Sequence, residues 1–478
     1  MRLWMDVMRD LEHVMDDHER LFDAWAAGGV DGLVIGPLEF NAAKLLPGVH
    51  YVPGATPPTP TFDPDPQVYR SFDVPVPDAP TEALPERRKL LMRTLSAAKD
   101  RGWSVYIFQA GAGAALPPPP AGAQGAAQRG NAITDEGIQR AMAARMVDAL
   151  NHYPMVDGAI MDGPEWGYEI APHHYNHRSD FFNDLPESLA PACDRLGYDY
   201  AQLVSAKDSL YARLHNLQDN PPPSETATPD TATPDMWGPA ALHAGFQRLH
   251  PDPNLTAWLQ FRLDTLTGFF AGIRERVDAH TNRPVKLGVG PRSAGFAPLC
   301  GYDMPRLGQI LDVLLPKHYF FQRGFDGMLG TILRYVETLV DWNPGLSDAA
   351  ALDVVATLFG LRLPGVTRRE DLESTLDRPE FYTTIVAQET RRALAAVDDP
   401  QRIVPWVDAG RAPHDGDPMP AGQLRALMQA AGDAGLQRIL YHHHGNLTPG
   451  EWAVMSELCG TPWRPLESAY APPDQLVL

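Results

Sequence analysis

Short apolar runs alternate with amphipathic segments along most of the chain. Eight runs read as strands because they are continuously apolar, as parallel strands buried on both faces are. They lie at residues 2–7, 32–35, 104–108, 158–161, 285–289, 313–315, 403–407 and 438–441. Between them, segments such as PERRKLLMRTLSAAKDRG and AGQLRALMQAAGDAG carry apolar residues at three- and four-residue spacing, which predicts helices.

These eight alternations predict the fold class α/β, and within it a (β/α)₈ TIM barrel rather than an open doubly wound sheet. No GxGxxG motif or P-loop follows the first strand, which weakens a nucleotide-binding alternative. We interpret residues 1–478 as a single catalytic barrel with insertions at 41–84, 111–131, 170–250 and 343–400. Long loops after the strands are typical of an elaborated active face.

Composition narrows the classes of partner. The formal net charge is -20, which argues against nucleic acid and against an anionic membrane surface. No apolar run approaches the ~20 residues that span a bilayer. The three cysteines are far apart and odd in number, so no disulfide framework is expected. We therefore expect a cytoplasmic protein that binds a small molecule, either alone or as a homo-oligomer.

The segment MDGPEWGYE after the fourth strand is the strongest candidate for chemistry. Asp162 ends the apolar run, and Glu165 lies on the following loop beside Trp166. A barrel strand directs its last side chains into the open mouth, so both carboxyl groups can reach a ligand there. Trp166 offers a flat apolar face of the kind that packs on a sugar ring. A turn cap at Asp162 and a solvated Glu165 form the alternative interpretation.

The segment PWVDAGR after the seventh strand supplies a second carboxylate. Asp408 closes this strand, on the same side of it as Trp406. Carboxyl groups from strands four and seven face each other across a barrel mouth, and such a pair can cleave a glycosidic bond. Asp408 could instead form a turn or an ion pair, and Asp326, after the sixth strand, is the alternative partner.

Polar and aromatic residues follow nearly every other strand and are interpreted as binding residues. Consecutive strand residues point to opposite sides, so at most two of the histidines at 442–444 face the mouth. The substrate-binding candidates are Glu39, Gln109, Trp166, Arg292, Lys317, His318, Tyr319, Asp326, Trp406, His443 and Asn446.

A metal site is the minor alternative. His173 and His177 are four residues apart with Asp180 close behind, a spacing that zinc ligands can use on a helix. Pro172 disturbs that helix and no HExxH motif is present. The main interpretation therefore contains no metal and no cofactor. No GxSxG elbow occurs, which disfavours a serine hydrolase.

The strand ends resemble those of uncharacterised glycoside-hydrolase-like TIM barrels. The resemblance rests on VDGAIMDGPEW, on WLQFRLDTLTGFFAGIRERV leading into PVKLGVGPR, and on HYF, PWVDAGR and YHHHGN. It spans most of the chain, although the motifs are short, and it implies a carbohydrate ligand. In the large clan with its acid and nucleophile on strands four and seven, both residues are Glu and Asn precedes the acid. Here Pro164 precedes Glu165, and strand seven offers Asp408.

The sequence thus predicts a glycoside hydrolase that acts on a small glycoside or oligosaccharide. In this hypothesis Glu165 protonates the leaving oxygen, and an apolar wall such as Trp166 favours its protonated form. Asp408 attacks or activates water, and Asp162 orients the site. In a second arrangement Asp162 is the nucleophile and Asp326 or Asp408 is the acid. A metal-dependent barrel hydrolase or isomerase and a non-catalytic carbohydrate-binding barrel are the alternatives.

Overall fold

A computed structural model gives the fold of the chain. It describes residues 1–8, 10–36, 38, 61–77, 84–109, 133–171, 181–218, 238–324, 326–411, 414 and 416–473. Glu39 and the histidine-rich segment with His173, His177 and Asp180 lie outside the described residues. The insertions expected at 41–84, 111–131 and 170–250 are described only in part.

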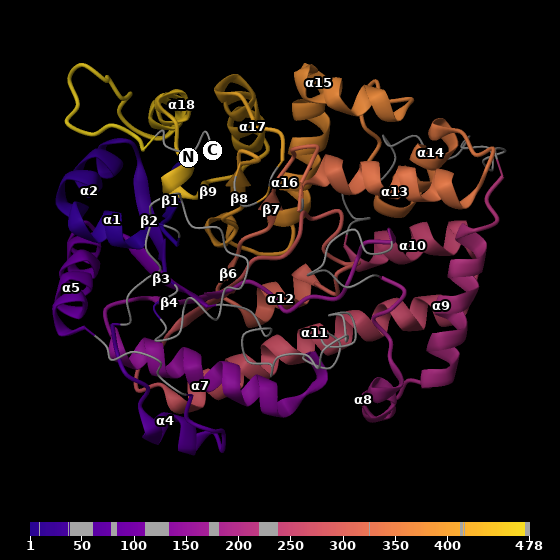
Figure 1. The fold of residues 1–478 in the computed structure, drawn as a ribbon, viewed down its shortest axis with the longest axis horizontal. Helices are drawn as coiled ribbons and strands as arrows, with labels where there is room; N and C mark the ends of the chain where they lie inside the picture. Colours follow the sequence, from indigo (N-terminus) through magenta and orange to yellow (C-terminus); the bar gives the residue numbers. More distant parts are fainter. Residues whose placement is uncertain are drawn as a thin grey trace.

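A parallel sheet of nine strands forms the centre of the molecule (Figure 1). Its order is β6-β5-β4-β3-β2-β1-β9-β8-β7, and every pairing is parallel. The strands are β1 (Arg2–Asp6), β2 (Val30–Ile35), β3 (Ser104–Gln109), β4 (Gly158–Met161), β5 (Lys286–Val289), β6 (Val313–Leu314), β7 (Lys317–His318), β8 (Trp406–Asp408) and β9 (Arg438–His442).

The two outermost strands of that order are parts of one extended segment. β6 pairs with β5, and β7 pairs with β8. Between them, the carbonyl oxygen of Pro316 accepts a hydrogen bond from the amide of Trp406. The amide of Val404 likewise donates to the carbonyl of Leu314. The sheet is therefore closed, and the TIM barrel expected from the sequence is confirmed.

Bulky side chains fill the inside of the barrel. Two glycines make room for them: a Cβ atom on Gly32 of β2 would lie 2.2 Å from the Trp4 ring, and one on Gly290, just after β5, would lie 2.1 Å from the Trp406 ring. The interior is a packed core below the mouth, as in other barrels of this type. Its residues are Trp4, Met8, Val34, Tyr106, Phe108, Ile160, Val313, Leu315, Tyr319, Phe321, Val404, Trp406 and Leu440.

Helices cover the outside of the barrel (Figure 1). Their starts follow ordinary capping chemistry: at α18, Thr448 and Glu451 form a reciprocal capping box ahead of Pro449. The helices of the outer layer are α1 (Leu11–Asp16), α2 (His18–Ala27), α4 (Pro66–Ser71), α5 (Pro85–Asp100), α7 (Glu136–His152), α11 (Pro253–His280), α12 (Met304–Ile310), α13 (Met328–Trp342), α17 (Ala421–Asp433) and α18 (Pro449–Cys459).

Two helical insertions widen one side of the molecule, the right half of Figure 1. The first contains α8 (Ala190–Leu196), α9 (Tyr200–Leu214) and α10 (Pro239–Leu249), and the second contains α14 (Asp348–Phe359), α15 (Pro379–Phe381) and α16 (Ala387–Leu394). α10 packs against both α11 and α14, so the insertions support each other.

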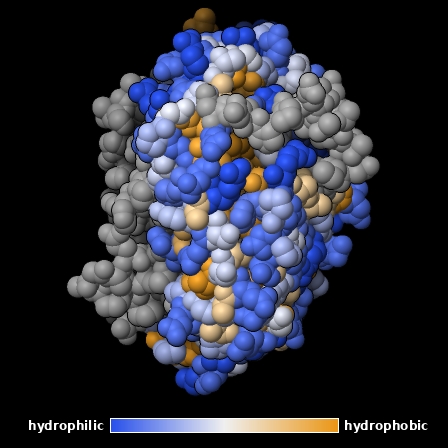
Figure 2. All heavy atoms as spheres, turned by 90° about the vertical axis from the view of Figure 1, so that its right-hand side faces the viewer, coloured by the Kyte–Doolittle hydropathy of each residue, from blue (hydrophilic) through white to orange (hydrophobic). Residues whose placement is uncertain are grey.

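The surface over these insertions is mostly hydrophilic with scattered apolar residues (Figure 2). Such single apolar residues are ordinary on protein surfaces. Among the described residues, no helix combines the length and apolar character needed to cross a bilayer.

Candidate functional site at the mouth of the barrel

Asp162 follows β4 directly and is a partly exposed charged group at the mouth. Its side chain is 42% exposed, whereas that of Lys317, whose Nζ lies 3.3 Å from Asp162 Oδ1, is 6% exposed. Side chains at the carboxyl ends of barrel strands point into the mouth. A buried ammonium group therefore holds a carboxylate that a ligand can reach from solvent.

Arg292, in the segment after β5, joins two buried carboxylates. Its Nε donates to Glu165 Oε2 at 2.8 Å and its Nη2 donates to Glu165 Oε1, which makes a bidentate pair. Its Nη1 pairs with Asp326. Burial alone would lower the pKa of Arg292, but Asp326 and Glu165 raise it well above its usual value.

Lys317 links this ion pair to Asp162. Its Nζ lies 3.2 Å from Asp326 Oδ2 as well as beside Asp162. Burial alone would raise the pKa of Asp326, but Arg292 and Lys317 hold it below its usual range. We refer to these alternating charges, Asp162, Glu165, Arg292, Lys317 and Asp326, as the Arg292 cluster.

A second group of titratable side chains comes from the ends of β1, β8 and β9. His442 Nδ1 lies 2.6 Å from Asp6 Oδ2, and His443 Nδ1 lies 3.4 Å from the same oxygen. His414 Nδ1 lies 2.9 Å from Asp408 Oδ2. We refer to Asp6, Asp408, His414, His442 and His443 as the histidine cluster.

Both carboxylates of the histidine cluster are buried. Asp6 is 0% and Asp408 is 1% exposed. Burial alone would raise the pKa of Asp408, but His414 and His442 hold it below its usual range. His443 and His442 lower the pKa of Asp6 in the same way, against the effect of burial. Imidazoles are therefore the groups that keep these two carboxylates ionised.

Tyr319 lies between the two clusters. Its ring stacks on that of His442, with 5.8 Å between centroids, and Lys317 Nζ lies 5.9 Å from its centroid. Burial and then the carboxylates of Asp408 and Asp162 raise the pKa of Tyr319 well above its usual value. The tyrosine side chain is thus within the electrostatic reach of both strand-end carboxylates.

The histidine cluster contains ligand sets that a metal ion could use. Asp408, His414 and His442 each offer a ligand atom, and these atoms lie within 4.8 Å of one another. Asp6, His442 and His443 form a second such set among the described residues, and His442 belongs to both. Two imidazoles with one carboxylate suit a transition-metal ion.

Glu165 occupies a different environment from the expected one. The sequence predicted an apolar wall from Trp166, but Glu165 is 7% exposed and is held by Arg292. Both carboxylate oxygens of Glu165 accept hydrogen bonds from the guanidinium, so the carboxyl group does not face an apolar wall. The pairing could not be seen beforehand because Arg292 is distant in sequence and belongs to another strand end.

Trp166 does not face the mouth, so the expectation that it stacks on a sugar is corrected. It is 1% exposed, and its Nε1 donates to the carbonyl of Arg262 at 3.0 Å and to Thr265 Oγ1 at 3.1 Å. Its ring packs near Phe261 of α11. The indole therefore anchors the β4 loop to the outer helices.

His318 also points away from the mouth, which corrects its assignment as a binding residue. Its two neighbours face inward, so the alternation of the strand turns it outward. It is 0% exposed, and its Nε2 lies 3.1 Å from Thr390 Oγ1 of α16. Burial lowers the pKa of His318 to about 3.

This burial predicts an acid sensitivity that can be measured. The folded state keeps His318 neutral, whereas the unfolded chain binds a proton below its usual pKa. Stability contributed by the neutral ring is present at neutral pH and declines as pH falls from about 6.5 toward 3, at roughly 1.4 kcal/mol per pH unit. The His318→Gln variant should lose this slope. Urea denaturation of both proteins between pH 4.5 and 7.5 tests it, and parallel slopes would contradict the assignment.

The remaining predicted binding residues lie at or below the mouth. Gln109 ends β3 and is 1% exposed. Trp406 belongs to the barrel interior, 5.5 Å from the His442 ring by centroids, and so forms part of the floor. Asn446 contributes its backbone carbonyl, which accepts from Arg411 Nη1 at 3.2 Å. Their roles toward a ligand stay predictions.

Asp6 and His414 were not predicted from the sequence, and His442 was considered only together with its neighbours at 442–444. Asp6 ends the first strand, so the rule that selected Asp162 and Asp408 could also have selected it. His414 lies in the loop after β8, where no periodicity places a side chain. Its position could be known only from the fold.

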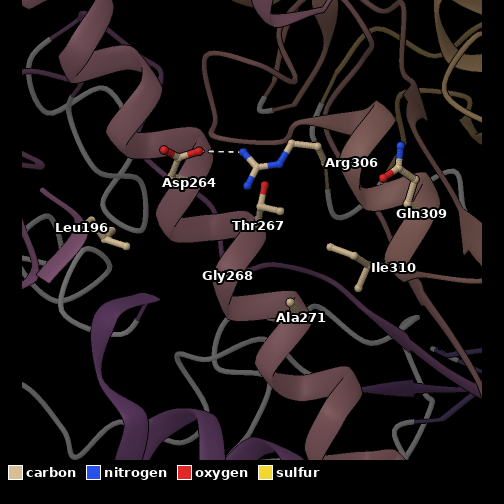
Figure 3. A pocket seen from close by; sticks show the side chains of 8 residues that line it. All are labelled: Leu196, Asp264, Thr267, Gly268, Ala271, Arg306, Gln309 and Ile310. Atoms are coloured by element: carbon tan, nitrogen blue, oxygen red, sulfur yellow. Dashed lines mark hydrogen bonds and ion pairs between the residues drawn. The ribbon is translucent and has the colours of Figure 1, made fainter.

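A cavity on the outside of the barrel is separate from the mouth (Figure 3). It lies mainly over α11 and α12, and the ion pair between Asp264 and Arg306, at 2.6 Å, borders it. The strand ends and both charged clusters contribute none of its lining residues. The residues that line it are Leu196, Asp264, Thr267, Gly268, Ala271, Arg306, Gln309 and Ile310.

No model of a known protein family matches this sequence, and a search of curated proteins finds no match either. Solved structures with a similar fold include the glycoside hydrolase domain of PgaB (BpsB) from Bordetella bronchiseptica. It is 13% identical, with a TM-score of 0.47, and the match covers 95% of this chain and 98% of that chain.

Two further similar structures are a class V chitinase from Pseudomonas fluorescens and the catalytic domain of β-amylase from Paenibacillus polymyxa. The chitinase is 10% identical with a TM-score of 0.40, and 96% of this chain and 99% of that chain are covered. The β-amylase is 9% identical with a TM-score of 0.39, and 97% and 99% are covered. These neighbours are glycoside hydrolase barrels, the class that the strand-end motifs resemble. Because the TM-scores of these three structures are below 0.5, their similarity carries no argument about the function of this chain.

Proposed function

We propose that this chain is a glycoside hydrolase whose substrate binds at the barrel mouth beside Asp162. The observation that carries the proposal is the difference in solvent exposure between Asp162 and the charged residues paired with it. Asp162 is partly open to solvent, whereas Lys317 and Asp326, which accompany it, are almost completely buried. A charged network that is buried except for one carboxylate at a strand end is the arrangement expected when that carboxylate meets a ligand.

In this proposal Asp162 attacks the anomeric carbon or deprotonates the attacking water. Lys317 forms an ion pair with Asp162, and Arg292 holds Asp326, the other carboxylate partner of Lys317, through an ion pair of its own. Glu165 becomes a positioning residue, because its carboxylate contacts the guanidinium rather than the open mouth.

The proton for the leaving oxygen comes from the other side of Tyr319 in this scheme. There, His414 Nδ1 lies 2.9 Å from Asp408 Oδ2, and in this scheme the proton held between these two atoms passes to the leaving oxygen. Cleavage breaks the glycosidic C–O bond, the leaving oxygen receives a proton, and water supplies hydroxyl to the sugar. This retains the pairing of strands four and seven, but Asp162 takes the nucleophile or base part first given to Asp408. Asp408, with His414, takes the acid part first given to Glu165, as in the second arrangement considered from the sequence.

The proposal is tested with a panel of aryl glycosides and oligosaccharides. We expect at least one substrate to release phenolate or reducing sugar in proportion to enzyme concentration. Thermal shift measurements with the same sugars accompany the assay. A sugar that raises Tm while the whole panel remains uncleaved would overturn hydrolysis in favour of a carbohydrate-binding barrel.

A further inference from the structure

The buried carboxylates of the histidine cluster differ from those of the Arg292 cluster in their counter-charges. Glu165 and Asp326 are paired with Arg292. Among the described residues, no lysine or arginine pairs with Asp6 or Asp408; their ion-pair partners are imidazoles. Buried charges require a compensating charge nearby. A dication bound here would lie beside two buried carboxylates that have no lysine or arginine ion pair among the described residues.

The ends of three adjacent strands, β1, β9 and β8, bring Asp6, His442 and Asp408 together. β9 lies between β1 and β8 in the sheet, and His442 is the register partner of Asp408. On its other side, His442 Nδ1 contacts Asp6 Oδ2 at 2.6 Å. When Nδ1 donates to that carboxylate, Nε2 carries the lone pair that a metal ion needs. A carboxylate behind a histidine in this way is the usual support for a metal-binding imidazole.

We infer that Asp408, His414 and His442 bind one divalent transition-metal ion such as Zn²⁺, with Asp6 orienting His442. The three ligand atoms lie within 4.8 Å of one another, and one carboxylate with two imidazoles is a ligand set that Zn²⁺ accepts, leaving one position for water or substrate. The positive charge of the ion would lie beside the two buried carboxylates, Asp408 as its ligand and Asp6 behind His442.

The ion would also offer a second way to stabilise the leaving oxygen of a substrate bound at the mouth. With the ion bound, Asp408 and His414 would serve as its ligands rather than as a proton source, and the ion would supply Lewis acidity toward the leaving oxygen. Binding itself does not depend on the proposed glycosidase activity. The two proposals can therefore fail separately.

The experiment uses the full chain, with any affinity tag removed, stripped with a chelator and dialysed. Zn²⁺ is titrated by calorimetry, and the Tm of the stripped protein is compared with that of the loaded protein. We expect one Zn²⁺ per chain and a rise in Tm. His414→Gln should abolish this stoichiometric binding, and Asp6→Asn should weaken it by about 10–100-fold, as is typical when a supporting carboxylate is lost.

His152→Gln is the matched control, because His152 Nε2 also lies near an aspartate, 3.4 Å from Asp148, but on α7 outside the mouth. It should bind Zn²⁺ as the unaltered chain does. Circular dichroism verifies that each variant is folded, and Co²⁺ absorption provides a second readout of nitrogen and oxygen ligation. Absence of saturable binding in the unaltered chain, or binding that survives both His414→Gln and Asp408→Asn, overturns the assignment.

Discussion

Replacing Asp162 by Asn is expected to reduce kcat on any cleaved glycoside by about 10²–10⁴-fold, with the fold intact. The amide keeps the size of the side chain but can neither attack a carbon nor accept a proton. The exposed position of Asp162 means that little packing is lost. Steady-state kinetics together with thermal denaturation measure both parts of this expectation.

Asp157→Asn is the control for position along the same strand. Asp157 precedes β4 at its opposite end, where its Oδ2 contacts Lys99 Nζ and the amide of Val105, each at 2.7 Å. Residues at that end of a barrel serve stability. The variant should lose some stability and retain its kcat. Equal loss of turnover in both variants, or normal turnover in Asp162→Asn, would remove Asp162 from the chemistry.

Among the proposed variants, Arg292→Met should lower the free energy of unfolding most, by about 3–5 kcal/mol. It leaves Glu165 and Asp326 buried without their shared partner. Methionine fills a similar volume, so the effect reports charge rather than a cavity. Urea denaturation at neutral pH measures the change in unfolding free energy. A loss below about 1 kcal/mol would show that solvent already compensates these carboxylates.

Neutralising the partners separates the charge effect from packing. In the triple variant Arg292→Met, Glu165→Gln, Asp326→Asn, no charge of the original trio remains, so most of the lost stability should return. Glu165→Gln alone should cost less than Arg292→Met, since Arg292 keeps its pair with Asp326. A triple variant as unstable as Arg292→Met would place the cost in shape rather than in charge.

The fold could be predicted from the sequence because each buried strand has its own run of apolar residues. Residues 158–161 were predicted with the bounds that the structure has, and the other strands differ by a few residues. The seventh predicted strand begins later than expected, at Trp406, because Ile403 pairs with Leu314 only as an isolated bridge. The break in the sixth strand at Pro316 reflects the missing amide hydrogen of proline.

Only part of the candidate site could be predicted from the sequence. A strand end shows that a carboxylate can face the mouth, as it does for Asp162 and Asp408, but it does not show what neutralises that carboxylate. The partners of Glu165 and Asp408 are Arg292 and His414, which tertiary structure alone brings near. The direction of Trp166 likewise depends on α11, an element about a hundred residues away in the chain.

The loop after β4 depends on ion pairs whose two members come from separate segments. Glu165 pairs with Arg292, and Glu169 pairs with Arg334 of α13. Either member of a pair without the other would be an uncompensated buried charge. Substitutions at these positions should therefore be correlated: in homologous chains, the two members of each pair should change together. The same coupling would make transplanting this loop into another barrel fail unless its arginines are moved with it.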